Sequence, residues 1–114
     1  MSKLTTHVLD TAKGKPAAGI TITVDLLETG GGPDPWKEVA RATTNADGRV
    51  ADFFPMGHVL QTGIYRLVFN VGPYLGQSAF YPSVPVIFQI TDSNQHYHVP
   101  LLLSPYGYST YRGS

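Results

Sequence analysis

Residues 63–71, GIYRLVFNV, decide the fold class, because apolar and polar side chains alternate along them with the period of a strand. Residues 20–27, ITITVDLL, alternate in the same way and are rich in β-branched side chains. Both segments therefore predict strands with one buried face.

Further strands are predicted on both sides of these two segments. The predicted strands span residues 4–10, 20–27, 36–44, 52–54, 63–71, 84–91, 95–103 and 106–112, and the loops between them contain turn signals such as GGGPDP and NADG. Residues 73–80 lack alternation and predict one short helix. Short strands spaced by about 8 to 15 residues favour a sandwich over a parallel α/β sheet. The fold class is therefore all-β, a two-sheet β-sandwich of about eight strands with one short helix, and Pro85 predicts an edge or bulged position.

The composition limits the classes of function. At 114 residues the chain fits a single domain, residues 1–114, and its 8 basic and 8 acidic side chains give no charge footprint for nucleic acid. The sequence has no cysteine, which excludes a disulfide framework and a thiolate nucleophile. No segment approaches the roughly 20 apolar residues of a membrane span. We expect a cytoplasmic protein with a small-molecule or protein partner, no nucleic acid and no membrane.

The segment HYHVPLLL, residues 96–103, carries the first candidate site. Alternation predicts that Tyr97, Val99, Leu101 and Leu103 face the core and that His96, His98, Pro100 and Leu102 lie on the opposite face. Two imidazoles beside apolar residues predict a site at an interface. In the first strand, Val8 on the core side would turn His7 and Leu9 outward in the same way. Arg49 follows the Asn-Ala-Asp-Gly turn at a loop mouth.

These residues also carry a resemblance to a known family. The motifs LTTHVLD (4–10), GKPAAGI (14–20), NADGR (45–49), GIYRLVF (63–69) and the terminal HYHVPLLLSPYGYSTYRGS (96–114) resemble the transthyretin-like family over nearly the whole chain. LSPYGYST marks the superfamily, whereas the closing Tyr111-Arg112-Gly113-Ser114 resembles its hydrolase branch. The resemblance implies hydrolysis of 5-hydroxyisourate without a cofactor, in a channel between two dimers of a homotetramer.

The resemblance also implies the site residues. It assigns catalytic roles to His7, Arg49, His98 and Ser114, and substrate binding to His7, Arg49, Tyr111, Arg112 and Gly113. The chemistry fits these residue types, because a histidine with a pKa near 6.5 can take a proton from water and give one to a departing nitrogen. Arginine suits negative charge developing on oxygen. Which histidine is the general base stays open, and the terminal carboxylate of Ser114 could orient a histidine or an arginine.

Two other classes of function are weighed against the hydrolase. One is a small-molecule carrier of the transthyretin type, and the other is a noncatalytic sandwich module that binds a metal. His96 and His98 could form half of a metal site, but no third ligand is spaced to complete it, so we expect no metal. We interpret His58 and His96 as structural or solvent-facing, and Tyr106 and Tyr108 as packing aromatics.

Overall fold

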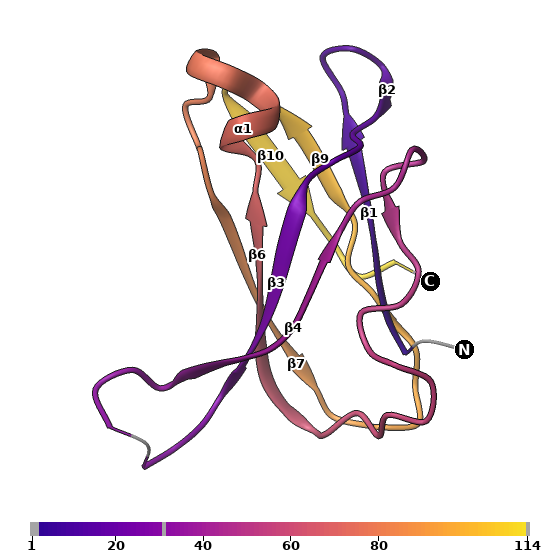
Figure 1. Cartoon of the computed structure of the whole chain (residues 1–114), viewed down its shortest axis with the longest axis vertical. Coiled ribbons are helices and arrows are strands. Elements are labelled where there is room, and N and C mark those ends of the chain that lie inside the picture. Colours follow the sequence, from indigo (N-terminus) through magenta and orange to yellow (C-terminus); the bar gives the residue numbers. More distant parts are fainter. Residues whose placement is uncertain (1–2, 31, 114) are drawn as a thin grey trace.

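Two sheets form the protein, as the computed structural model shows for residues 3–30 and 32–113 (Figure 1). The first sheet has the strand order β4-β3-β6-β7, with bounds Trp36–Thr43 (β4), Thr21–Leu27 (β3), Gly63–Asn70 (β6) and Val84–Ile90 (β7). All its pairs are antiparallel. The two segments with the clearest alternation, β3 and β6, pair with each other at its centre, as expected for strands with one buried face.

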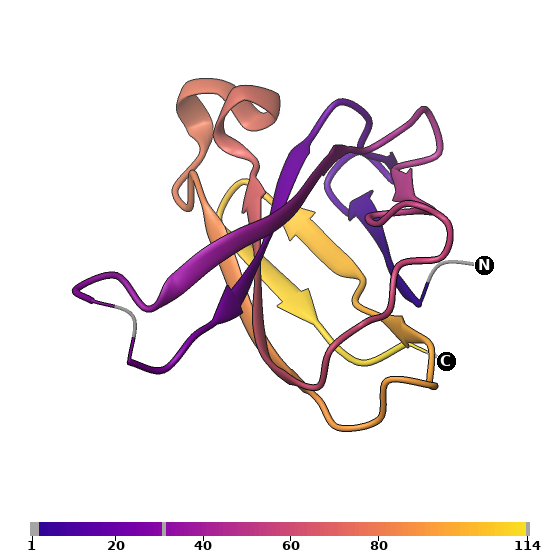
Figure 2. The same cartoon turned by 60° about the horizontal axis from the view of Figure 1, so that its bottom comes forward.

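The second sheet is built around the first strand, β1 (Leu4–Asp10). Its strand order is β10-β9-β1-β2, with bounds Gly107–Thr110 (β10), Leu101–Ser104 (β9) and Lys15–Pro16 (β2). Two further short strands, Arg49–Val50 (β5) and Tyr97–His98 (β8), also pair with β1. β1 runs parallel to β8 and β9, although a long separation in sequence divides them. Figures 1 and 2 show the first strand and the C-terminal segment side by side.

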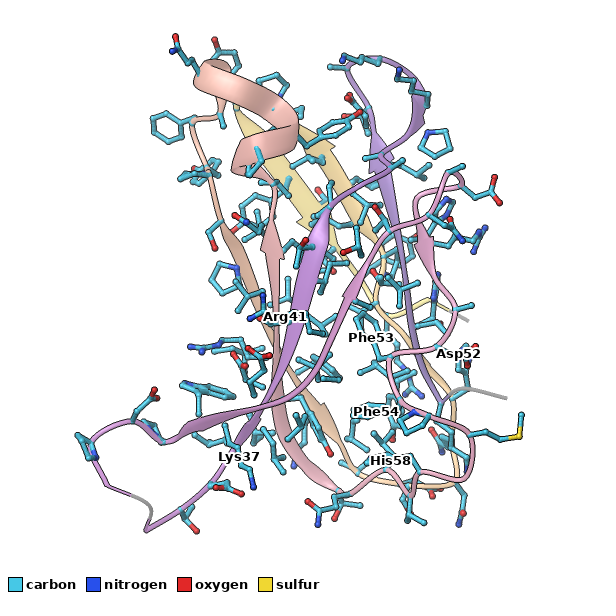
Figure 3. All side chains as sticks on the ribbon, in the orientation of Figure 1. Lys37, Arg41, Asp52, Phe53, Phe54 and His58 are labelled. Atoms are coloured by element: carbon cyan, nitrogen blue, oxygen red, sulfur yellow. The ribbon has the colours of Figure 1, made fainter. Side chains whose placement is uncertain are left out.

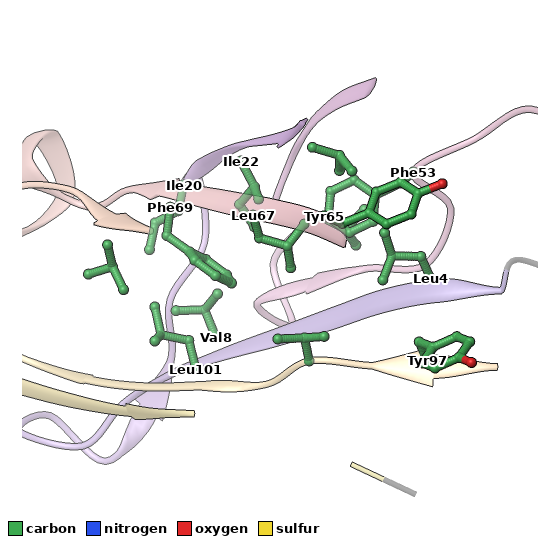
Figure 4. Packing of buried hydrophobic residues seen from close by; sticks show 14 of the residues in the cluster. Leu4, Val8, Ile20, Ile22, Phe53, Tyr65, Leu67, Phe69, Tyr97 and Leu101 are labelled. Atoms are coloured by element: carbon green, nitrogen blue, oxygen red, sulfur yellow. The ribbon is translucent and has the colours of Figure 1, made fainter. Parts of the chain in front are cut away.

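The core lies between the two sheets. Ile22, Leu67 and Phe69 from the first sheet meet Val8 and Leu101 from the second, and all five are fully buried (Figure 4). The predicted inward face of residues 97–103 is confirmed, since its four side chains, Tyr97, Val99, Leu101 and Leu103, are all buried. His7 and Leu9, on the outward face of β1, are half-buried.

Two predicted strands differ from the structure. Residues 52–54 form a bend and not a strand; the strand lies earlier, at Arg49–Val50, because the Asp-Gly turn returns the chain directly onto β1. The predicted strand 95–103 is split into β8 and β9 by Val99 and Pro100, since proline has no N–H for the ladder. Pro100 is buried, so its predicted outward position is wrong. The described chain has ten assigned strands, three of them two residues long, compared with the eight expected.

The helical segment and the sheet edges follow the prediction more closely. Gly72–Leu75 form α1, and Gly76–Ser78 continue it as a 3-10 turn (η1), which confirms a short helix in this region. Proline stands at the first turn of α1, where its missing N–H costs nothing. β7 is the edge strand of its sheet, as Pro85 predicted. Within residues 3–30 and 32–113 there is no helix long and apolar enough to cross a membrane.

Candidate active site

The register of β1 brings the candidate site together from three distant segments. His7 pairs with Arg49 across β1 and β5, and Thr5 pairs with His98 across β1 and β8. Gly113 forms a bridge to the far side of His98, where its N–H donates to the His98 carbonyl over 2.8 Å. Because Thr5 and His7 are two residues apart on one strand, their side chains share a face. The predicted residues His7, Arg49, His98 and Gly113 therefore meet on one face of the second sheet.

A rigid turn positions Arg49. The side-chain carbonyl of Asn45 accepts the backbone N–H groups of Asp47 over 2.9 Å and Arg49 over 3.0 Å. Gly48 has φ 72°, and a Cβ on it would lie 2.4 Å from the backbone oxygen of Val8. Only glycine fits a turn that is left-handed and also this close to β1. The NADG sequence therefore delivers Arg49 opposite His7 in a fixed register.

Burial and the Arg49 charge lower the pKa of both imidazoles. Burial, and then the Arg49 guanidinium, lower the pKa of His7 below its ordinary 6.5. A hydrogen bond to the Asp47 backbone and the charge of Asp47 act in the opposite direction and are weaker. Burial also lowers the pKa of His98, followed by the charges of Arg49, His96 and His7, and a hydrogen bond to the Thr5 backbone opposes them. Near neutral pH, two imidazoles able to accept protons thus lie beside a permanent cation.

Thr5 is a site residue that the sequence interpretation missed. Its hydroxyl lies 2.8 Å from Nδ1 of His98 and 2.9 Å from Nε2 of His96. His96 is exposed, as predicted, but it is not separate from the site, because this hydroxyl connects it to His98 and the two rings stack at 6.4 Å between centroids. The available signal was the alternation of β1, which puts Thr5 on the same face as His7.

Gly113 lies closer to an imidazole than any residue with a side chain could. A Cβ at this position would be 2.5 Å from Cδ2 of His98 and 3.2 Å from Cγ. Carbon atoms in van der Waals contact are about 3.5–4.0 Å apart. The terminal segment can therefore cover the His98 ring only because residue 113 is glycine.

The remaining terminal residues are placed differently. Arg112 stacks its guanidinium on the Tyr97 ring at 4.6 Å and donates to Gln95 Oε1 over 2.9 Å, so it lies on the side of the strand opposite His98. Tyr111 and Arg112 line a cavity of about 230 Å³ together with residues of β7, and this cavity contains neither site histidine. The structure does not bring these two side chains to the imidazoles. Ser114 lies outside the described residues.

Other predicted residues lie outside this group. His58 is exposed and stacks on Phe54 with 4.2 Å between ring centroids, in the loop after β5 (Figure 3). Tyr106 and Tyr108 were interpreted as packing aromatics, but they are 75% and 40% exposed. Across residues 3–30 and 32–113, no three His, Cys, Asp or Glu side chains are grouped as metal ligands.

The fold and these side chains define a two-sheet β-sandwich with two imidazoles and a guanidinium gathered on one face of one sheet. A sequence model of the HIUase/Transthyretin family matches residues 4–113, and the chain belongs to that family. The 5-hydroxyisourate hydrolase 2 of Rhizobium meliloti is 50% identical to this chain, over 98% of this chain and 96% of the relative. The resemblance drawn from the motifs is thereby confirmed.

Solved structures of both branches have the same fold. The structure of Klebsiella pneumoniae 5-hydroxyisourate hydrolase has a TM-score of 0.82 and 34% identity, and the match covers 100% of both chains. Sea bream transthyretin in complex with thyroxine has a TM-score of 0.86 and 29% identity, over 97% of this chain and 94% of that chain. The fold therefore does not separate a 5-hydroxyisourate hydrolase from a transthyretin that binds thyroxine, and the separation has to come from sequence identity and from the site.

Proposed function

We propose that the protein hydrolyses 5-hydroxyisourate to 2-oxo-4-hydroxy-4-carboxy-5-ureidoimidazoline in urate breakdown, by opening a cyclic amide. The observation that carries the proposal is the convergence of two imidazoles of lowered pKa and one guanidinium on one face of β1. The name of the Rhizobium meliloti relative, at 50% identity, supplies the substrate.

The proposed reaction needs only acid–base groups. One imidazole, of His7 or His98, takes a proton from water as the water oxygen bonds to the ring carbonyl carbon. The Arg49 guanidinium stabilises the negative charge that develops on the carbonyl oxygen. The C–N bond then breaks, and the protonated imidazole or its neighbour gives a proton to the departing nitrogen. The proposed reaction contains no redox step and needs no cofactor.

The terminal residues complete the proposed site as one wall. Gly113 brings the backbone against the His98 ring, and Ser114 follows it, so we include the terminal hydroxyl and carboxylate as groups that orient an imidazole or Arg49. Tyr111 and Arg112 remain proposed substrate contacts. For Arg112 this role requires the guanidinium to leave the Tyr97 ring and Gln95.

Site polarity argues against the carrier alternative. A hydrophobic ligand gains little from a surface that presents Arg49 and two imidazoles, because their desolvation would have to be compensated. The direct test generates 5-hydroxyisourate with urate oxidase and follows its ultraviolet decay. We expect purified protein to accelerate the decay and His98→Ala to abolish most of the acceleration. Decay at the spontaneous rate, together with saturable thyroxine binding, would favour the carrier.

We also propose a homotetramer whose dimers enclose the site. Two observations support it: β7 and β10 are open edges of their sheets, and large apolar side chains beside these edges are exposed, such as Ile87 at 62% and Tyr111 at 57%. Light scattering after gel filtration should give four times the 12.4 kDa chain mass. A monomer at assay concentration would remove the shared channel from the proposal. A cytoplasmic location is part of the same proposal and is tested by fractionation of cells.

A further inference from the structure

The terminal segment, residues 110–113, leaves the second sheet and returns to it. β10 pairs with β9 as far as Thr110 and Leu101, and pairing resumes at the bridge between Gly113 and His98 in the same antiparallel register. Residues 111 and 112, between these two points, belong to no strand. The interruption lies opposite Pro100, which has no N–H for the ladder. Contacts other than the β10–β9 ladder therefore have to hold this part of the segment.

Side chains make those contacts. The Thr110 hydroxyl donates to the Pro100 carbonyl over 2.7 Å. The Arg112 guanidinium stacks on the Tyr97 ring at 4.6 Å and donates to Gln95 Oε1 over 2.9 Å. The Tyr97 ring is a fixed surface, because it is buried and its hydroxyl is hydrogen-bonded to the backbone of the preceding loop. Arg112 is thus held against an ordered part of β8.

These contacts lie next to a site imidazole. Gly113 directly follows Arg112, and its N–H donates to the His98 carbonyl over 2.8 Å. One ordinary hydrogen bond contributes less than the conformational entropy that is lost when several residues are ordered. The Gly113 bond therefore needs support from neighbouring contacts, and the stacked guanidinium of Arg112 is next to it in the chain.

We propose that Arg112 is a positioning residue that holds the terminal segment on β8 and thereby keeps Gly113 against the His98 ring. A planar guanidinium suits this role, because it stacks on an aromatic ring and donates hydrogen bonds in its own plane. Arg112 acts from the face of β8 opposite the imidazole. The inference rests on the proposed function for its catalytic consequence, since a displaced Gly113 would let the imidazole turn.

Gln95→Ala distinguishes this role from a contact with substrate. The variant removes one of the two partners of Arg112, so we expect kcat to fall about threefold with KM within about twofold, the effect of one exposed hydrogen bond. A contact with substrate requires the guanidinium to leave Gln95, so on that basis the variant leaves kcat unchanged or raises it. Gln95→Glu keeps an acceptor oxygen and should restore kcat on the alkaline side of the acid limb.

Hydrogen exchange at the Gly113 amide measures the attachment without any substrate. Protein labelled with ¹⁵N-glycine shows the glycine amides by NMR, and the Gly113 signal is assigned by its loss in Gly113→Ala. We expect the Gly113 amide to exchange about threefold faster in Gln95→Ala, and about tenfold faster in Arg112→Met, which loses the stacking as well. In Gln95→Glu the exchange rate should return to the wild-type value.

Asn94→Ala is the matched control. Asn94 is the neighbour of Gln95 and also carries an exposed amide side chain. Its hydrogen bond to Asp92, 2.9 Å long, is made by the backbone N–H, which alanine keeps. The variant should therefore change neither the exchange of the Gly113 amide nor kcat. Because both side chains are exposed, neither alanine variant removes core packing.

The outcomes keep this inference separate from the proposed function. If the wild type does not accelerate 5-hydroxyisourate decay, the function fails, while Gly113 exchange still decides whether Arg112 holds the segment. If the wild type is active but Gln95→Ala leaves the exchange rate unchanged, the positioning role is wrong and the hydrolase assignment stands. Faster exchange with unchanged kcat also overturns the proposal, because the attachment would then have no catalytic consequence.

Discussion

Gly113→Ala tests whether the terminal segment shapes the catalytic geometry. The added methyl would lie 2.5 Å from Cδ2 of His98, where carbon atoms normally keep about 3.5 Å. Either the imidazole or the terminal backbone has to move by about 1 Å. The Gly113 N–H donates to the backbone carbonyl of His98 over 2.8 Å and so holds the terminal backbone next to β8. The imidazole ring therefore takes part of the movement.

The expected loss follows from the size of this displacement. A misplacement of about 1 Å at a reacting group can cost on the order of a hundredfold in rate. We therefore expect kcat/KM for 5-hydroxyisourate to fall about a hundredfold, which corresponds to roughly 2.7 kcal/mol of transition-state stabilisation. The unfolding midpoint should change little, because residue 113 lies beyond the last strand and does not belong to the core.

A glycine in the same hairpin provides the control. At Gly107 an added Cβ would meet only Ser104 Oγ, at 3.9 Å, and the backbone φ is outside the left-handed region. Gly107→Ala should therefore retain wild-type kcat/KM in the ultraviolet assay. Equal activity of Gly113→Ala and the wild type would refute the argument that the close approach to His98 matters.

Three further predictions concern charge. Arg49→Gln removes a charge that lowers the pKa of both site imidazoles, so the acid limb of the kcat/KM profile, which we expect below pH 6.5 in the wild type, should move to higher pH. Burial raises the pKa of Asp10, but the hydrogen bonds that its carboxylate accepts outweigh burial and leave the pKa lowered. One of these bonds comes from the Tyr74 hydroxyl over 2.8 Å. Burial, and then this bond, raise the pKa of Tyr74 to about 12. Tyr74→Phe should therefore reduce the free energy of unfolding by about 1–2 kcal/mol at pH 7, and the difference should narrow as pH falls below about 4, where the lowered pKa of Asp10 no longer contributes. Arg66→Met leaves the buried Asp25 carboxylate without its ion pair, 2.7 Å long, and should cost about 2 kcal/mol in urea unfolding.

Each of these has a control or a contrary outcome. An unchanged acid limb in Arg49→Gln would show that the guanidinium does not act on the imidazoles. If the free energies of unfolding of the wild type and Tyr74→Phe differ by the same amount from pH 7 to pH 3, the argument from the lowered pKa of Asp10 is wrong. For Arg66→Met the control is Arg41→Met, because Arg41 pairs with Glu38 over 3.0 Å in the open on β4, and its loss should leave the urea midpoint unchanged (Figure 3).

Side-chain period alone predicted much of the fold. Alternation in residues 63–71 and 20–27 identified the two central strands of the first sheet, and the inward face of residues 97–103 was correct to the residue. Two strand boundaries could not be predicted from side-chain alternation. Pro100 breaks the long C-terminal strand because it lacks an N–H, and the turn at Gly48 starts a strand at Arg49 that has too few residues to show a period.

Site prediction divides in the same way. His7, Arg49 and His98 were predicted from their side-chain chemistry and from the family motifs. The outward face of β1 was predicted from the alternation around Val8. Thr5 and His96 were missed because their importance lies in one hydroxyl between two rings, a contact across 91 and 93 residues of chain. For Arg112, the motif implies a contact with substrate, and the structure adds that its guanidinium stacks on Tyr97; the substrate contact stays a prediction.

The sequence by itself therefore determined the all-β class, the two central strands and the kinds of groups available for catalysis, because alternation and residue chemistry are local properties. Only the tertiary structure decided that β1 runs parallel to β8 and places Thr5 beside His98, and that Gly113 closes on the same ring. Register between distant strands depends on how two sheets pack over a shared core, and no local pattern contains that information.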